Sequence, residues 1–414
     1  MICDPRDMLT VIEHEGRAPK RAGFDLVTTY VKANRIKTLA TMDGDEWYHL
    51  RMKVQTSFLR PGSADPYVPD LGLVTDDLVT YFERGHSQGD ARDVIFLYIL
   101  ECLFQFCFNR RLGALTPHGA EENNETVTQM RALISTLARP PVIKLHRLWK
   151  TKAYTNVENS MNHLIGLAQS EVKLAFERLS ANQKRDPDSP HLIESLLTQT
   201  DLTPEEVVRS MSDFFFGGAD TTSKNLGMLL FHMAKYTDQQ EMLYQEIKAS
   251  IGSNILVTPR DLAKMEFMNA CVKESMRLAF PLAPGPARVI PQDLVLSGYR
   301  VPKGTLVMLC NTACLHDPAL VHDPDGFRPE RWLRNRDRMK NETIPTVCYL
   351  PFGIGVRMCL GKRFAEQIMR LCLVKLVQKY ELRLIDDPKD INITYQIFPT
   401  IDRPLRIQFI PRPT

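Results

Sequence analysis

The residues of this chain that are best suited to chemistry lie in one short stretch, residues 351–366. Cys359 stands there two residues after Arg357, between a loop that contains Gly353 and Gly355 and a segment of strongly helical composition. A helix start favours a thiolate over a thiol, because its free N–H groups and its dipole stabilise negative charge. Glycines tolerate positive φ and let the backbone pass close to a flat ligand. Each of these residue types has a reason if Cys359 is the axial thiolate ligand of a haem iron.

Two further residues near this cysteine suit the same chemistry. Arg357 is a cation that can pair with a haem propionate, and Gly361 has no side chain at the point where the helix would approach the porphyrin. A lone cysteine in such a turn is more often a buried, unreactive thiol, so the cysteine alone does not decide the matter. The complete pattern, Phe352-x-x-Gly355-x-Arg357-x-Cys359-x-Gly361, is far more specific than any one of its residues.

This pattern resembles the signature of the cytochrome P450 family of haem-thiolate monooxygenases. The resemblance implies a haem b cofactor whose iron is bound by Cys359, with Phe352, Gly353, Arg357 and Gly361 in the haem-binding site. In that family the thiolate ligand promotes cleavage of the O–O bond of dioxygen. The implied fold is mainly α: a helical bundle with a long, kinked central helix and small β-sheets.

Other residues match haem contacts of the same family. Trp47 and Arg51 are four residues apart and share one face of an expected helix. On their own they would be read as a core tryptophan beside a solvated arginine. The family has Trp-x-x-x-Arg in this region, with both side chains on haem propionates, and Arg288 matches the position of a further propionate ligand.

Residues 203–236 should form a long helix, because they open with Thr-Pro-Glu-Glu, a combination typical of a capped helix start. Inside it, Gly217 and Gly218 cost about 1 kcal/mol each relative to alanine, so they require a reason. One reason is a tolerated kink, and the other is a distortion that admits a small ligand beside Asp220 and Thr221. The residues Gly218-Ala219-Asp220-Thr221 resemble the family's oxygen-activation motif, which favours the second reason. The resemblance implies that Asp220 and Thr221 form the catalytic proton relay.

Glu274 and Arg277 lie three residues apart on one face of another expected helix. Such pairs are usually solvated surface ion pairs that contribute little to stability. Here Arg331 follows at the distance usual in the family. The resemblance implies that the three residues form a buried structural triad that stabilises the haem-binding core and has no catalytic role.

Length and composition set broader limits. The chain has 414 residues, 44% hydrophobic and 24% charged, which is ordinary for a globular protein with a large core. The net charge of +3 argues against a nucleic-acid partner. The nine cysteines show no metal-binding spacing and are read as reduced thiols. Residues 288–290, 294–301 and 305–309 alternate like strands.

The resemblance covers essentially the whole chain, which predicts a single cytochrome P450 domain over residues 1–414. No stretch reads as a transmembrane helix or a targeting segment. Because the match begins near the family's second helix, we expect the N-terminal anchor or transit segment and the first elements to be missing.

Within the family the chain looks most like the mitochondrial members. Val356 and Met358 replace the Pro and Asn that are common in microsomal members, and residues 362–366 match the mitochondrial run. This implies the matrix side of the mitochondrial inner membrane, with peripheral membrane association, and the endoplasmic reticulum is the alternative. The implied substrate is lipophilic, either sterol- or secosteroid-like or a xenobiotic. Core packing is the alternative role for the expected substrate contacts: Phe214, Gly218, Ala219, Ala283, Ala287, Ile397 and Phe398.

The electron donor is expected on the cysteine side of the haem. The resemblance places four basic residues there that would steer an acidic partner: Lys273, Lys362, Arg363 and Arg370. The mitochondrial likeness favours a small acidic 2Fe–2S ferredoxin, and a diflavin reductase is the alternative. The position four before Lys273, usually lysine in mitochondrial members, is Asn269.

Two other functions stay open on the same fold. One is an isomerase or dehydratase that rearranges activated oxygen without an electron partner, and the other is a non-catalytic haem-binding protein. A sensor would not need the proton relay of Asp220 and Thr221. We therefore expect insertion of one oxygen atom of O2 into a C–H bond of an apolar substrate.

Overall fold

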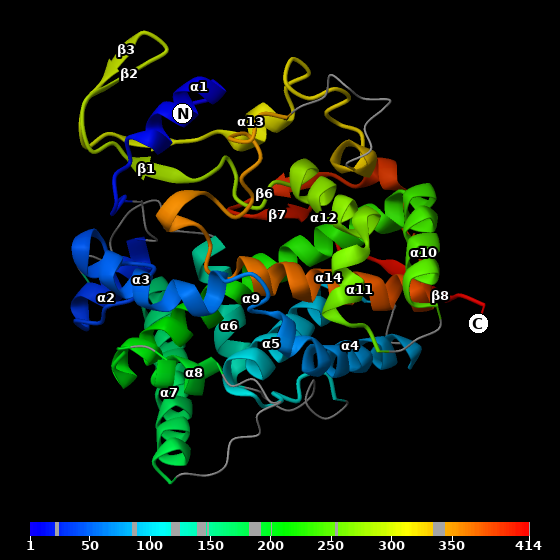
Figure 1. The fold of residues 1–414 in the computed structure, drawn as a ribbon, viewed down its shortest axis with the longest axis horizontal. Helices are drawn as coiled ribbons and strands as arrows, with labels where there is room; N and C mark the ends of the chain where they lie inside the picture. The colour runs from blue at the N-terminus through cyan, green and yellow to red at the C-terminus, as the bar shows by residue number, and fades with distance from the viewer. Residues whose placement is uncertain are drawn as a thin grey trace.

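The computed structural model describes residues 1–20, 25–84, 89–116, 125–138, 146, 149–181, 192–199, 201–252, 256–333 and 344–413. Helices dominate these ranges and surround the long helix α9 (Figure 1). In chain order the helices are α1 (Pro5–Glu13), α2 (Asp25–Ala33), α3 (Gly44–Leu59), α4 (Val68–Glu83), α5 (Ala91–Phe108), α6 (Glu125–Ala138), α7 (Lys152–Ser180), α8 (Leu192–Gln199), α9 (Pro204–Lys235), α10 (Thr237–Ile251), α11 (Pro259–Lys264), α12 (Glu266–Leu278), α13 (Asn311–Leu315) and α14 (Lys362–Lys379).

Helix α9 begins where the sequence predicts. The Thr203 hydroxyl accepts a hydrogen bond from the Glu206 N–H at 3.2 Å, and the Glu206 carboxylate accepts one from the Thr203 N–H at 2.9 Å. This reciprocal pair satisfies two N–H groups that a helix start otherwise leaves free. The C-terminal half of α9 is buried from Leu226 to Ala234, and α5 and α7 pack along the helix. Because it is covered on several sides, α9 can hold functional side chains rigidly.

The strands of the described residues form four two-stranded antiparallel sheets. Strand β1 (Ala287–Val289) pairs with β4 (Leu306–Met308), β2 (Leu294–Leu296) with β3 (Tyr299–Val301), β5 (Tyr380–Leu384) with β8 (Ile407–Pro411), and β6 (Ile393–Tyr395) with β7 (Pro399–Ile401). The segment 294–301, expected as one strand, is a hairpin. It turns at Ser297 and Gly298, whose φ angles of 47° and 81° lie in the left-handed region.

The mainly α fold with small sheets is confirmed. A larger hydrophobic core fills the helical body, and a smaller one joins α1, α13 and the β1–β4 region. The expected kink is not seen as a break, because α9 is helical without interruption from Pro204 to Lys235. Within the described ranges, no helix combines the length and apolar composition needed to cross a membrane.

Candidate active site

The loop before Cys359 is shaped by its glycines. Gly353 and Gly355 have φ of 72° and 68°, which disfavours residues with a Cβ. A Cβ on Gly355 would also lie 2.7 Å from the Glu15 carboxylate. The Cys359 N–H donates to the Phe352 carbonyl at 2.8 Å and closes the loop. Cys359 is exposed and lies two residues before Gly361, the N-cap of α14, whereas seven of the nine cysteines are buried.

Arg357, two residues before Cys359, is buried and is held by contacts with the N-terminal part of the chain. Its guanidinium lies over the Trp47 ring, 3.4 Å from the ring centroid. Its Nε donates to the Pro19 carbonyl at 2.8 Å, and its Nη2 pairs with the Asp43 carboxylate at 2.9 Å. The structure therefore brings together two of the predicted haem contacts, and it adds Asp43 as a counter-ion that the motif did not reveal.

The other two predicted propionate ligands also reach this region. Arg51 is buried on α3, and its Nη2 donates to the Met358 carbonyl at 2.7 Å, one residue before the thiol. Arg288 on β1 is buried in an ion pair between its Nε and the Glu15 carboxylate, and its Nη1 donates to the Ala287 carbonyl. Glu15 lies against Gly355 as well, so Arg288 is linked to the cysteine loop.

These residues fit a haem. The donor set combines an exposed thiol with buried guanidinium groups, which suit an iron and two propionates respectively. A Cβ at Gly361 would lie 3.9 Å from Cys359 Sγ and 3.5 Å from Phe214 Cε2, both ordinary contact distances, so Gly361 lies directly beside the thiol. Cys359 would ligate the iron, and Arg51, Arg288 and Arg357 would hold the propionates.

The two adjacent glycines of α9 have different surroundings. A Cβ on Gly218 would lie 3.0 Å from Leu103 Cδ2, so this glycine allows α5 to approach closely. A Cβ on Gly217 would have no neighbour within 4 Å. The Thr221 hydroxyl donates to the Gly217 carbonyl at 2.8 Å, which places the hydroxyl on the open side of the helix. Sequence reasoning treated the glycines alike and missed Gly217 as the one that faces open space.

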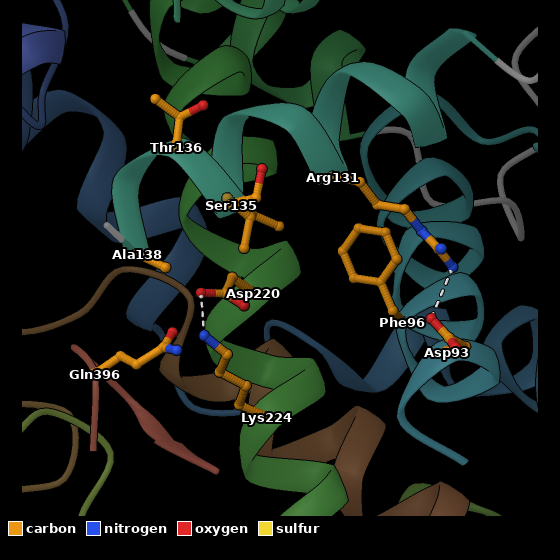
Figure 2. Close-up of a pocket in the computed structure, with 10 residues that line it drawn as sticks. Asp93, Phe96, Arg131, Ser135, Thr136, Ala138, Asp220, Lys224 and Gln396 are labelled. Carbon is orange, nitrogen blue, oxygen red and sulfur yellow. Dashed lines mark hydrogen bonds and ion pairs between the residues drawn. The ribbon is translucent and has the colours of Figure 1, made fainter. Parts of the chain in front are cut away.

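Asp220 is held by a neighbour on its own helix. Its Oδ2 lies 3.0 Å from Lys224 Nζ, one turn further along α9, as Figure 2 shows. The two side chains are only 17% and 19% exposed, respectively. Burial raises the pKa of Asp220 above its ordinary value, although the Lys224 ammonium acts in the opposite direction. An acid of this kind is suited to proton transfer. The spacing of four residues could have indicated Lys224 from the sequence.

Some of the expected substrate contacts meet near α9. The Ala283 N–H donates to the Ile397 carbonyl at 3.3 Å, which joins two segments far apart in sequence. The Phe398 ring centroid lies 5.4 Å from Lys224 Nζ. Ala287 lies on β1, beside Arg288. Ala283, Ile397 and Phe398 therefore lie in one region, whereas Ala287 pairs with its partner strand β4.

The expected contacts on α9 have packing roles in the structure. Phe214 joins an aromatic cluster, with Phe58 and Phe106 each 5.0 Å away between ring centroids. Ala219 is fully buried, and Gly218 faces α5. Their assignment as substrate contacts stays a prediction, because core packing accounts for what is seen.

The predicted partner residues differ in their surroundings. Lys273 is exposed, whereas Lys362 and Arg363 are partly buried. Arg370 is 26% exposed and lies 3.7 Å from the Glu366 carboxylate, and burial lowers its pKa. Asn269 stands where the mitochondrial pattern has lysine, and its side-chain amide donates to the Met265 carbonyl at 2.7 Å and to the Leu262 carbonyl at 3.3 Å.

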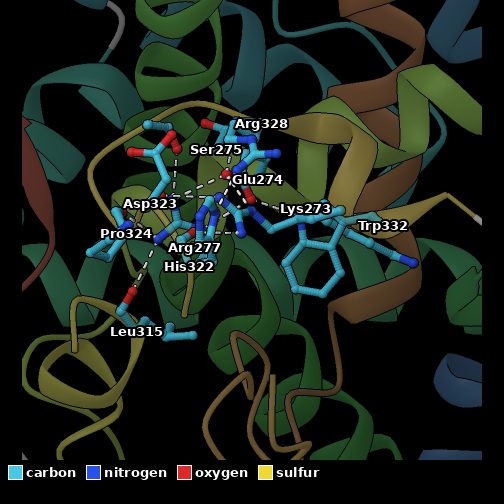
Figure 3. Close-up of polar contacts among 12 residues, drawn as sticks. Lys273, Glu274, Ser275, Arg277, Leu315, His322, Asp323, Pro324, Arg328 and Trp332 are labelled. Carbon is cyan, nitrogen blue, oxygen red and sulfur yellow. Dashed lines mark hydrogen bonds and ion pairs between the residues drawn. The ribbon is translucent and has the colours of Figure 1, made fainter. Parts of the chain in front are cut away.

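Glu274, Arg277 and Arg331 form a buried network. Figure 3 shows Glu274 and Arg277 at its centre. The Glu274 carboxylate accepts hydrogen bonds from Arg277 Nη2, Arg331 Nε and the Arg328 N–H, each at 3.0 Å. It also accepts one from Trp332 Nε1 at 2.8 Å. The guanidinium groups use their remaining nitrogens on backbone carbonyls of residues 315, 322–324 and 326. The network ties α12 to the segment that precedes the cysteine loop.

Comparisons with known proteins agree with this geometry. The model of the cytochrome P450 family matches residues 1–409. Cytochrome P450 10 of Lymnaea stagnalis is 29% identical over all of this chain and 76% of its own length. The mitochondrial sterol 26-hydroxylase of Homo sapiens is 26% identical over 97% of this chain and 78% of its own. The probable cytochrome P450 CYP44 of Caenorhabditis elegans is 30% identical over 94% of this chain and 77% of its own length. The chain therefore belongs to the cytochrome P450 family, whose members are monooxygenases that bind haem through a cysteine thiolate.

Proposed function

We propose that this monooxygenase hydroxylates a lipophilic, sterol-like substrate in mitochondria, with electrons from a 2Fe–2S ferredoxin. One observation carries the hydroxylation mechanism: Thr221 and Asp220 are adjacent on α9, one beside the open space at Gly217 and the other beside a solvent-accessible cleft. The sterol class, the donor and the location are supported by the similarity to proteins named mitochondrial sterol 26-hydroxylase.

The chain's own residues have distinct tasks in this mechanism. Haem, when bound through Cys359, supplies the activation of dioxygen. Arg51, Arg288 and Arg357 would hold its propionates. The Thr221 hydroxyl holds a proton at Oγ1, and Asp220 replaces that proton from water.

The relay is tested by Thr221→Ala in the haem-loaded protein. Without the hydroxyl, proton delivery slows, so product formed per electron pair should fall about tenfold or more, with release of peroxide. Thr222→Ala is the matched control, because Thr222 is the adjacent residue and is buried on another face of α9. Equal coupling in both variants and in the unmodified protein would contradict the relay.

The substrate class is tested by spin-state shifts of the haem. A panel of sterols, secosteroids, apolar xenobiotics and small polar compounds is titrated into the oxidised protein. Sterol-like compounds should give saturable shifts at the lowest concentrations. Shifts confined to the small polar compounds would rule out a lipophilic substrate.

The electron donor is tested by separate reconstitution with an acidic ferredoxin and with a diflavin reductase. Turnover should require the ferredoxin, and its rate should fall as salt screens the attraction to basic residues such as Lys273 and Lys362. Turnover with the reductase alone would exclude the ferredoxin and the mitochondrial location. Product formation from a peroxide substrate with neither donor would favour the isomerase or dehydratase alternative.

A further inference from the structure

The pair of Asp220 and Lys224 borders two cavities at once. The first has a volume of about 590 Å³ and lies among α5, α6, α9 and the turn between β6 and β7. The second, of about 240 Å³, lies between α5, α9 and the region around β7. Figure 2 shows Asp220 and Lys224 of α9 at the first cavity, which Gln396 also lines. Water in this first cavity, called the relay cleft below, can therefore reach the carboxylate.

Lys224 is fixed by contacts on two sides. Its ammonium lies 3.0 Å from the Asp220 carboxylate and 5.4 Å from the centroid of the Phe398 ring. The aromatic face attracts the cation, so the lysine has little freedom to leave the carboxylate. Thr221, the next residue of α9, has its hydroxyl on the Gly217 carbonyl. Asp220 thus borders the relay cleft and is adjacent in sequence to the residue that carries the predicted catalytic hydroxyl.

The other charged groups around the relay cleft are paired with each other. Arg131 of α6 lies 3.1 Å from the Asp93 carboxylate of α5, and Figure 2 shows this pair at the far end of the cleft. Arg92, which lines the second cavity, pairs with Asp90 at 2.6 Å. Among the residues that the structure describes, the charged group in contact with Asp220 is Lys224.

We propose that Lys224 is a positioning residue that holds the Asp220 carboxylate beside the relay cleft and controls its exchange of protons with cleft water. The inference rests on the proposed relay through Asp220 and Thr221 and adds a residue that the family motif does not contain. In each cycle the carboxylate takes a proton from the cleft and gives one towards Thr221, so no net charge accumulates. The ammonium stabilises the ionised form between transfers.

The test compares Lys224→Met with Lys224→Arg and with Arg131→Met in the haem-loaded protein. Burial raises the pKa of Asp220 and the Lys224 ammonium lowers it. Without the ammonium the pKa should rise further, so the carboxyl group of Asp220 should ionise at a higher pH. The pH at which coupling of electrons to product is half-maximal should therefore rise in Lys224→Met, and coupling at neutral pH should fall several-fold. Lys224→Arg keeps the positive charge, so its pH of half-maximal coupling and its coupling at neutral pH should match those of the unmodified protein. Arg131→Met removes a cation of the same cleft that pairs with Asp93 and not with Asp220. It should leave the pH of half-maximal coupling and the coupling at neutral pH unchanged.

A second readout does not depend on turnover. The carboxyl stretching band of Asp220, identified by its loss in Asp220→Asn, is titrated by infrared spectroscopy in each variant. Its midpoint should rise in Lys224→Met and not in Arg131→Met. Unchanged midpoints and coupling profiles in Lys224→Met would overturn the role of Lys224, while a Thr221→Ala effect would leave the proposed function standing. If Asp220→Asn did not uncouple turnover, both the inference and the carboxylate step of the relay would fall.

Discussion

Two acid–base pairs of this protein are built alike and placed differently. Glu274 with Arg277 and Asp220 with Lys224 are both ion pairs within one helix, each with a separation of 3.0 Å. The first pair is completely buried, and Glu274 also accepts hydrogen bonds from the Arg328 N–H and from Trp332 Nε1. The second is partly exposed and borders two cavities. The difference separates a pair that fixes structure from a pair that can exchange protons with water.

The physical reason is the cost of a buried charge. A buried ion pair holds its geometry only if further hydrogen bonds satisfy the remaining atoms, and losing one partner leaves an uncompensated charge. Glu274 meets that condition through Arg331, the Arg328 N–H and Trp332. Asp220 has Lys224 alone among its described side-chain partners, so its protonation responds to the relay cleft.

The largest effect is expected from Glu274→Ala. Removing the carboxylate leaves the buried guanidinium groups of Arg277 and Arg331 without their negative partner, so the free energy of unfolding should fall by about 3–5 kcal/mol. Chemical denaturation and haem content measure the change. Lys273→Ala, at the exposed neighbouring position, should change stability by less than about 0.5 kcal/mol. A loss of similar size in both variants would mean that the buried network is not what stabilises this region.

A smaller effect is expected from His232, which lies next to the Glu274 network. Its Nδ1 is 2.9 Å from the Ser275 hydroxyl, and burial lowers its pKa to about 3 from the ordinary 6.5. Below pH 6.5 the unfolded state binds the proton more tightly, so the contribution of His232 is present above pH 6.5 and is lost as the pH falls towards 3. Between pH 6.5 and pH 5 the loss should be about 2 kcal/mol.

The matched variant is His232→Gln, and unfolding is followed across that range of pH. This variant should lose the part of the acid dependence that comes from His232. If the free energy of unfolding varied with pH as steeply as in the unmodified protein, His232 would not be its source. Asp220 should act with the opposite sign. Its raised pKa means that the folded state binds the proton more tightly, so its contribution is lost as the pH rises through the folded pKa.

The smallest effect is expected at the paired glycines of α9. Gly217→Ala should raise the free energy of unfolding by about 1 kcal/mol, because alanine favours the helix and its Cβ meets no neighbour. Gly218→Ala should not give this gain, because Leu103 must move to admit the Cβ. Chemical denaturation of the two variants decides the matter. Equal changes would mean that the open space beside Thr221 is not specific to Gly217.

Local patterns made much of the fold and site predictable. The Thr203 cap fixed the start of α9, and the glycine loop fixed the place of Cys359, since each depends on neighbours in sequence. The strands were less exact: Ser297 takes a left-handed conformation that its residue type does not favour, so the hairpin was read as one strand.

Long-range contacts were beyond sequence reasoning. The pairing of Arg288 with Glu15 and of Arg357 with Asp43 joins residues hundreds of positions apart, and no local pattern encodes it. The relay cleft is likewise lined from four separate elements. The distinction between Gly217 and Gly218 depends on where α5 passes, which a single sequence does not show.

The most direct measurement of the central claim is the absorption spectrum of the reduced protein with carbon monoxide bound. With Cys359 as the axial thiolate, the main band should lie in the red-shifted range of thiolate-ligated haem, and Cys359→His should move it out of that range. A band of the unmodified protein outside the red-shifted range, or one that Cys359→His leaves in place, would contradict the assignment.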